Sequence, residues 1–335
     1  MKTLRKCQLD KALDTISQNA VVYAPVKKGE MSCFVRYQDG VELELEENTL
    51  FSPKGILFPA AEKMYSYETT GLDMEIKKSD REFGLSVLFG VRSCDVQAIV
   101  CLDDVFLSKG FADEYYLTRR QETTIVALGC TNPGVNCFCQ SMGLNPLEHE
   151  MADVQLFDLG DIYGLRARTE KGEILVKALD EVGLLAAGEG VSNPEVGEFF
   201  YNFSPEGVVE KLQMMFESPL WNELAQKCLN CGVCTFLCPT CHCFDISGKK
   251  QTAHCGHKLR CWDSCMFSEY TLMAGGHNPR PTKMERVRQR FMHKLRYFPE
   301  RYGKFLCTGC GRCMAKCPVN LEITQVIRQV KEAVI

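Results

Sequence analysis

Residues 228–243, CLNCGVCTFLCPTCHC, contain six cysteines. Four of them have the spacing C-x2-C-x2-C-x3-C, and Pro239 follows the fourth. The same spacing returns in residues 307–317, again followed by a proline, Pro318. Bacterial ferredoxins use this run to hold [4Fe-4S] clusters, and in two-cluster proteins the fourth cysteine of each run ligates the other cluster. We therefore expect two clusters in this part of the chain.

The exchange of fourth cysteines predicts two ligand sets. The first is Cys228, Cys231, Cys234 and Cys317, and the second is Cys307, Cys310, Cys313 and Cys238. Small residues at Gly232, Gly309 and Gly311 are expected to let the backbone bend close to the sulfurs. Zinc is the alternative, but structural zinc usually takes four ligands in two separated pairs, which fits these runs poorly.

The distance between the two runs predicts the fold around them. They are 68 residues apart (307 − 238 − 1), far more than in a small β-ferredoxin, and the insert contains the helix-like PTKMERVRQRFMHKLRYF. We therefore predict a mainly α-helical, ferredoxin-like domain over residues 206–335, with little strand. A closing helix is expected over EITQVIRQVKEAVI, with Ile323, Ile327, Val330 and Val334 on one face.

Five more cysteines lie inside or beside this insert: Cys241, Cys243, Cys255, Cys261 and Cys265. One interpretation is a further metal site, with Cys241, Cys243 and Cys265 as candidate ligands and His242, His254 or His257 contributing. The other is packing around the clusters, because a free cysteine behaves as a small hydrophobic residue.

Composition limits the class of protein. The 335 residues carry a net charge of −4, which gives no global bias toward nucleic acid or membrane. No apolar run approaches the roughly 18 residues of a membrane span, and the first residues lack the apolar core of a secretory signal. We therefore expect a cytoplasmic protein. Twenty cysteines in such a chain indicate metal binding or catalysis rather than disulfides.

The first part of the chain, residues 1–205, alternates strand and helix signals and predicts an α/β domain. Strands are expected over 20–26, 33–37, 85–91 and 123–129, and a helix with Asp95 as N-cap follows Val91. Residues 162–179 are expected to form a strand, a Lys-Gly turn and a second strand. Residues 183–207 are rich in Gly, Pro, Ser and Asn and are expected to join the two domains.

A third site is predicted in this α/β domain. Cys94 follows one predicted strand, Cys130 ends another, and Cys137 and Cys139 lie in the adjoining loop. Because sites in α/β sheets form at the carboxyl ends of strands, these four thiols could meet there. Thiolates select an iron–sulfur cluster or zinc, and buried free thiols remain the alternative. Asp95 could replace one ligand, or could serve only as the helix cap.

Residues 280–304 hold nine Lys or Arg and two Asp or Glu. Cations beside an anionic cluster raise its potential, and the same residues could dock an acidic partner. A solvated helix face and a nucleic-acid surface are the other interpretations, although the chain has no recognised nucleic-acid-binding motif.

Six segments in order resemble a known family: GVRSCDVQA, NCFCQSMG, CLNCGVCTFLCPTCHCFD, WDSCMF, AGGHNPRPTKMERVRQRFMHK and FLCTGCGRCMAKCPVN. They are similar to the iron–sulfur β subunit of cytoplasmic NiFe hydrogenase/sulfur reductase (sulfhydrogenase) complexes and to the corresponding subunit of anaerobic sulfite reductase. The resemblance implies an electron carrier that connects an FAD-containing NAD(P)H reductase subunit with a separate catalytic subunit. It also supports the two ferredoxin runs and the third site.

We therefore predict an electron-transfer subunit of an oxidoreductase complex, with no catalytic residues of its own. No Gly-rich dinucleotide fingerprint follows a strand, so flavin and nicotinamide should belong to a partner. The catalytic partner would be a NiFe hydrogenase or a sirohaem sulfite reductase. Two competing hypotheses are an enzyme that turns over alone and a nucleic-acid-binding protein with structural clusters. We expect neither nucleic acid nor membrane as a partner.

Overall fold

The structure is a computed structural model that describes residues 1–79, 83–188 and 192–334. Its strands are β1 (Lys2–Arg5), β2 (Val21–Lys28), β3 (Met31–Arg36), β4 (Ala61–Thr70), β5 (Asp73–Lys78), β6 (Ser86–Val91), β7 (Thr123–Leu128), β8 (Val154–Asp158), β9 (Ile162–Ala167), β10 (Leu185–Ala187), β11 (Phe244–Lys250) and β12 (Cys255–Trp262). Its α-helices are α1 (Leu9–Ser17), α2 (Lys54–Leu57), α3 (Ser93–Leu107), α4 (Glu114–Glu122), α5 (Glu170–Glu181), α6 (Val208–Met214), α7 (Leu220–Lys227), α8 (Val233–Phe236), α9 (Lys283–Met292), α10 (Phe298–Tyr302), α11 (Arg312–Ala315) and α12 (Ile323–Glu332). None of the helices in these ranges is both long and apolar enough to cross a membrane.

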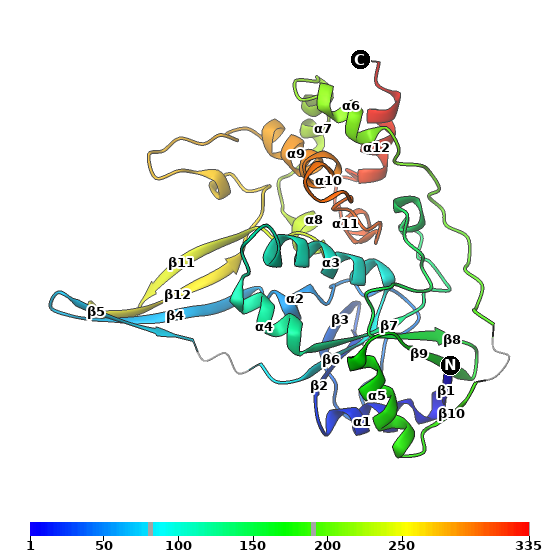
Figure 1. Cartoon of the computed structure of the whole chain (residues 1–335). Helices are drawn as coiled ribbons and strands as arrows, with labels where there is room; N and C mark the ends of the chain where they lie inside the picture. The colour runs from blue at the N-terminus through cyan, green and yellow to red at the C-terminus, as the bar shows by residue number, and fades with distance from the viewer. Residues whose placement is uncertain (80–82, 189–191, 335) are drawn as a thin grey trace.

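The N-terminal part is built on an eight-stranded sheet in the order β10-β1-β9-β8-β7-β6-β2-β3. Strands β2, β6, β7 and β8 run parallel, and their residues alternate between two cores. Val87 and Phe89 pack in the core with α1 and α5, whereas Leu88 and Val91 pack in the core with α3. Figure 1 shows these helices on opposite faces of the sheet. The α/β fold predicted for this part is confirmed.

The prediction for residues 162–179 was only half right. The first strand is β9, but the following segment is the helix α5 instead of a second strand. Thr169 caps this helix by accepting a hydrogen bond from the backbone N–H of Gly172, at 3.3 Å. Glu170 and Glu173 lie in the first turn, where carboxylates favour a helix N-terminus. Gly172 is therefore a helix residue packed against the backbone of Asp153, not a turn residue.

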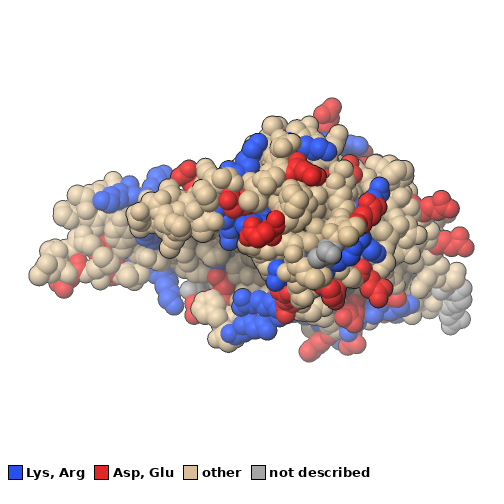
Figure 2. Space-filling model, turned by 90° about the horizontal axis from the view of Figure 1, so that it is seen from above, with Lys and Arg blue, Asp and Glu red and all other residues tan. Residues whose placement is uncertain are grey.

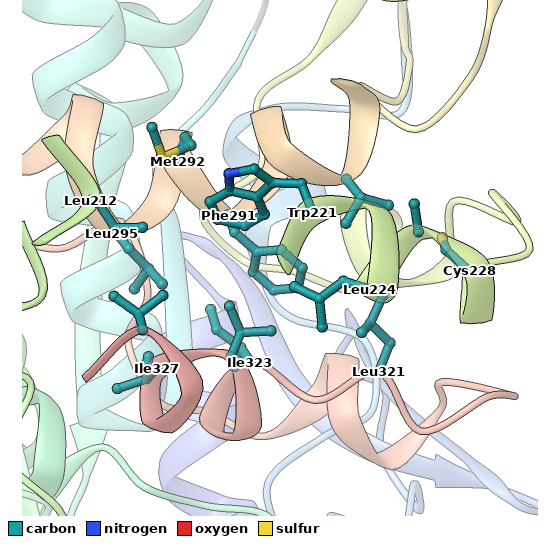
Figure 3. Close-up of a cluster of buried hydrophobic side chains, with 14 of the residues drawn as sticks. Leu212, Trp221, Leu224, Cys228, Phe291, Met292, Leu295, Leu321, Ile323 and Ile327 are labelled. Atoms are coloured by element: carbon teal, nitrogen blue, oxygen red, sulfur yellow. The ribbon is translucent and has the colours of Figure 1, made fainter. Parts of the chain in front are cut away.

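Another core, separate from the two on the faces of the sheet, lies among the C-terminal helices, above the sheet in Figure 1. Helices α6, α7, α9 and α12 enclose Trp221, whose indole N–H donates to the carbonyl of Met215 at 2.7 Å. Figure 3 shows Phe291 beside this ring, with Ile323 of α12 on the other side of Phe291. The closing helix was predicted with Val334 on its buried face, but α12 ends at Glu332 and Val334 is fully exposed.

A β-hairpin inside the second half of the chain was not predicted. Strands β11 and β12 join β4 and β5 in a four-stranded sheet of order β11-β12-β4-β5, which projects from the body in Figures 1 and 2. Arg260 on β12 is buried and binds Glu62 on β4 and Asp113 before α4. This sheet therefore crosses the predicted boundary between residues 205 and 206. Within the predicted junction, 185–187 form β10, and 189–191 lie outside the described residues.

His149 fixes the loop that leads from the third predicted site into β8. Its ring is buried, and its Nδ1 accepts a hydrogen bond from the backbone of Met151 at 3.2 Å. The other nitrogen, Nε2, then carries the proton and donates to Gln97 on α3 at 3.0 Å. Burial lowers the pKa of His149, because the charged form would lose both water and the Nδ1 acceptor.

Candidate metal centre

The first predicted ligand set lines one pocket. Cys228, Cys231, Cys234 and Cys317 surround a space of about 450 Å³, part of it open to solvent. Helix α7 ends at Lys227 and delivers the chain into Cys228. At the start of α8, Gly232 has a φ of +77°, and a Cβ there would meet the Phe267 ring at 2.8 Å. The glycine is therefore required both by its own backbone and by this aromatic neighbour.

The second predicted set also lies together. The Thr240 hydroxyl lies 3.1 Å from the Cys238 sulfur and donates to the carbonyl of Leu306 at 2.6 Å, which places this cysteine of the first run next to the start of the second. Burial raises the pKa of Cys307 to about 12 and also raises that of Cys313. Iron that binds such thiols must displace their protons. The free energy of iron binding therefore has to exceed the cost of forming thiolates in a buried site.

Buried cations face this second set. The Lys294 ammonium lies 3.1 Å from the Cys238 sulfur and 3.0 Å from the Thr240 hydroxyl, and its side chain is buried. It belongs to His293–Tyr297, a π-helical segment that continues α9 into α10. The π turn widens the helix at the residue that faces the sulfur, and such turns are frequent at functional sites. Lys294 lowers the pKa of Cys238, after the hydrogen bond from Cys241.

Buried polar groups of Arg290 and Thr308 show whether these pockets suit an anionic cluster. Arg290 is buried, lines the first pocket and also acts on Cys313 of the second set. Its Nε and the Thr308 hydroxyl have no hydrogen-bond partner among the described residues. A buried N–H or O–H group without a hydrogen-bond partner is costly, whereas cluster sulfurs and thiolates would compensate it. The donor set and the unpaired groups therefore both fit thiolate-bound iron–sulfur clusters.

The third predicted set is brought together as well. Cys94 lies in the first turn of α3 after β6, and Cys130 lies just after the parallel neighbour β7. These two and Cys137 and Cys139 line a pocket of about 390 Å³. Burial raises the pKa of Cys137 to about 11 and that of Cys139 to about 12. The carboxyl ends of adjacent parallel strands thus explain why sequence-distant thiols meet here.

Asp95 is neither the cap nor free to serve as a ligand. The N-cap of α3 is Arg92, and Asp95 lies inside the first turn. Its carboxylate is buried and accepts hydrogen bonds from both terminal nitrogens of Arg312, at 2.5 and 2.7 Å. Both interpretations of Asp95 made from the sequence are therefore replaced by an ion pair with the second ferredoxin run.

The second and third sites are in direct contact. Cys310, a member of the second set, also lines the pocket of the third. The backbone N–H of Phe138 donates to the carbonyl of Gly309 at 2.8 Å. A Cβ at Gly309 would lie 2.5 Å from the backbone nitrogen of Cys139, and one at Gly311 would lie 2.4 Å from the carbonyl oxygen of Asn136. Glycine is therefore required at both positions so that the Cys137–Cys139 loop can approach the second run. This requirement was not predicted from the sequence.

The additional cysteines form close pairs beside the sets already described. Cys241 is hydrogen bonded to Cys238, and Cys243 is hydrogen bonded to Cys265, which lowers the pKa of Cys243. Cys255 and Cys261 lie on β12 in the projecting sheet. In the ranges that the structure describes, no group of three or more His, Cys, Asp or Glu side chains is arranged to hold a single metal ion.

The basic residues of segment 280–304 divide into a buried group and a partly or fully exposed group. Arg286, Arg290 and Lys294 are buried and recur every fourth residue, so they share one face of α9 and its continuation. This four-residue spacing could have predicted from the sequence that these three residues are buried, unlike the other basic residues of the segment. On the face seen in Figure 2, lysine and arginine lie in small groups among acidic side chains. The contacts of Arg312 and Thr240 at the cysteine sites could not be predicted from the sequence, because neither residue belongs to a recognisable pattern.

Two comparisons with known proteins agree with this geometry. Residues 227–321 match the family model of the 4Fe-4S dicluster domain. Over 321 residues the chain is 34% identical to subunit beta of sulfhydrogenase 2 from Pyrococcus furiosus, an alignment that covers 94% of this chain and 93% of that protein.

Proposed function

We propose, from the premise that this chain belongs to the family of sulfhydrogenase β subunits, that it relays electrons between two other subunits of an oxidoreductase complex. Its 4Fe-4S dicluster domain and this family membership make it an iron–sulfur electron-transfer subunit. The subunits that it would connect are an FAD-containing NAD(P)H reductase and a catalytic subunit of the NiFe hydrogenase/sulfur reductase type.

The observation that carries the proposal is the continuity of the three cysteine sets. We assign Cys238 of the first run to the second set because Thr240 links it to Leu306, directly before Cys307, and Cys310 of the second set lines the pocket of the third. The proposed ligands are Cys228, Cys231, Cys234 and Cys317, then Cys307, Cys310, Cys313 and Cys238, then Cys94, Cys130, Cys137 and Cys139. When bound, the clusters would supply one-electron oxidation and reduction at each set.

The chain's own residues hold these sites and set their electrostatics. Lys294 and Arg290 place positive charge beside the thiols of the first and second sets, which favours the reduced form of an anionic centre. Cys231 is the one exposed cysteine among the twelve proposed ligands. The first set therefore reaches the surface and is our candidate for electron exchange with a partner.

The intact complex, purified anaerobically through a tag on this chain, tests the proposal. We expect NAD(P)H to reduce the iron–sulfur absorbance of the complex, and to leave that of the isolated, cluster-loaded chain unchanged. Nickel or sirohaem in the co-purified catalytic subunit would identify it as hydrogenase or sulfite reductase. Equal reduction of the isolated chain by NAD(P)H alone, or turnover by that chain, would contradict a pure relay.

A further inference from the structure

The contact between the second and third sites contains a buried ion pair that the sequence motifs do not predict. Arg312 lies between Cys310 and Cys313 in the second run, and Asp95 directly follows Cys94. The two side chains are 3% and 1% exposed, so water does not screen their charges. Each charge therefore belongs, by its place in the chain, to a different cysteine set.

The guanidinium of Arg312 donates five hydrogen bonds to residues of the N-terminal part. Besides Asp95, it donates from Nε to the carbonyl of Thr49 at 2.6 Å and from Nη2 to the Asn48 carboxamide at 2.7 Å. The amide of Asn48 in turn lies 3.6 Å from the sulfur of Cys94. The planar fork of arginine suits this arrangement, since lysine could not make these directed contacts together. The network therefore fixes the second run against the third pocket.

The ion pair is also oriented. The positive member, Arg312, begins α11 directly before Cys313 and two residues after Cys310. The negative member, Asp95, lies in the first turn of α3 directly after Cys94. The second set thus experiences mainly the positive end of the pair, and the third set mainly the negative end.

We propose that the Arg312–Asp95 ion pair positions the second and third sites against each other and makes the second site easier to reduce than the third. Positive charge favours the reduced state of an anionic centre and negative charge disfavours it. An electron at the third site therefore moves toward the second with a favourable driving force. The inference rests on the proposed function, because it requires a cluster at both sites.

Redox titration followed by electron paramagnetic resonance tests this on the anaerobically purified chain with its clusters. Arg312→Gln should lower the midpoint potential of the second site, with a smaller change at the third. Asp95→Asn should raise the midpoint of the third site, with a smaller change at the second. A merely structural pair would move both variants in the same direction. A Cys137→Ser background, which removes the third site, assigns the signals.

Two controls keep the result interpretable. Arg120→Gln breaks another partly buried pair, Arg120 with Asp103 at 3.1 Å, away from the cysteine sets, and should leave both midpoints unchanged. The double variant Arg312→Gln with Asp95→Asn leaves two neutral amides that can still bond, and should bring the two midpoints closer together even if a single variant fails to fold.

Iron content separates the two possible failures. About twelve iron per wild-type chain with midpoints that do not respond, or that shift in the same direction in both variants, would overturn the ion-pair proposal alone. About eight iron per wild-type chain, the content of two four-iron clusters, would overturn the three-site relay and this proposal with it.

Discussion

Gly309→Ala should break the contact between the Cys137–Cys139 loop of the third site and the second ferredoxin run. The new Cβ would lie 2.5 Å from the Cys139 backbone nitrogen and 2.6 Å from the Phe138 carbonyl carbon, where neither atom can yield without moving the loop. The φ of +66° costs a non-glycine residue about 1–2 kcal/mol. Overpacking adds about 1–3 kcal/mol, and loss of the hydrogen bond from Phe138 about 0.5–1.5 kcal/mol.

Together these costs, about 2.5–6.5 kcal/mol, destabilise the contact between the Cys137–Cys139 loop and the second run. We therefore expect the variant to lose the third cluster while it keeps the first, which lies elsewhere. Iron analysis and paramagnetic resonance of the anaerobic protein would measure this as a fall of about four iron per chain.

Gly303→Ala is the matched control. Gly303 has a φ of +72°, but a Cβ there meets no atom within 4 Å. It therefore carries only the backbone cost of about 1–2 kcal/mol, and its iron content should match the wild type. A Gly309→Ala protein with wild-type iron and thermal midpoint would refute the reasoning, and so would equal iron loss in the two variants.

Three further predictions follow from buried groups. Arg260→Met should destabilise the fold by about 1–3 kcal/mol, measured by thermal unfolding, because the buried carboxylate of Glu62 loses one partner and keeps, among the described residues, only Arg119; an unchanged midpoint would contradict it. Lys294→Met should lower the midpoint potential of the second site without loss of iron, because a cation 3.1 Å from the Cys238 sulfur is removed, and an unchanged or higher potential would be inconsistent with this role. His149 has a lowered pKa when folded, so its contribution is complete above its unfolded pKa of 6.5 and is lost as the pH falls. The wild type should therefore lose up to about 1.4 kcal/mol per pH unit more than His149→Asn below that pH, seen in thermal midpoints at pH 7.5 and 5.5; parallel losses would argue against it.

The cysteine sets could be predicted because their spacing is local. A run such as C-x2-C-x2-C-x3-C places its ligands within one loop and a short helix, so little beyond the sequence is needed. The third set was predictable for a different reason, since strand ends of a parallel sheet converge and loop cysteines follow them. Cys94 and Cys130 therefore line one pocket although 35 residues lie between them (130 − 94 − 1).

The parts that could not be predicted depend on contacts between distant segments. Strands β11 and β12 carry Ser247, Gly248 and several charged residues, so they lack the apolar alternation of a half-buried strand and form by pairing with β4. Asp95 was assigned to its own helix because its partner, Arg312, is 217 residues away. The last part of residues 162–179 was predicted as a strand because the Lys-Gly pair suggested a turn, but the segment forms α5, which Thr169 caps.

Iron and acid-labile sulfide per chain, measured on anaerobically purified wild type and on Cys137→Ser, test the central claim most directly. Three clusters predict about twelve iron in the wild type and about eight in the variant, from four iron per cluster. About eight in both would mean that Cys94, Cys130, Cys137 and Cys139 hold no cluster. The N-terminal α/β part would then be a docking scaffold, and the proposed relay would be confined to the C-terminal part.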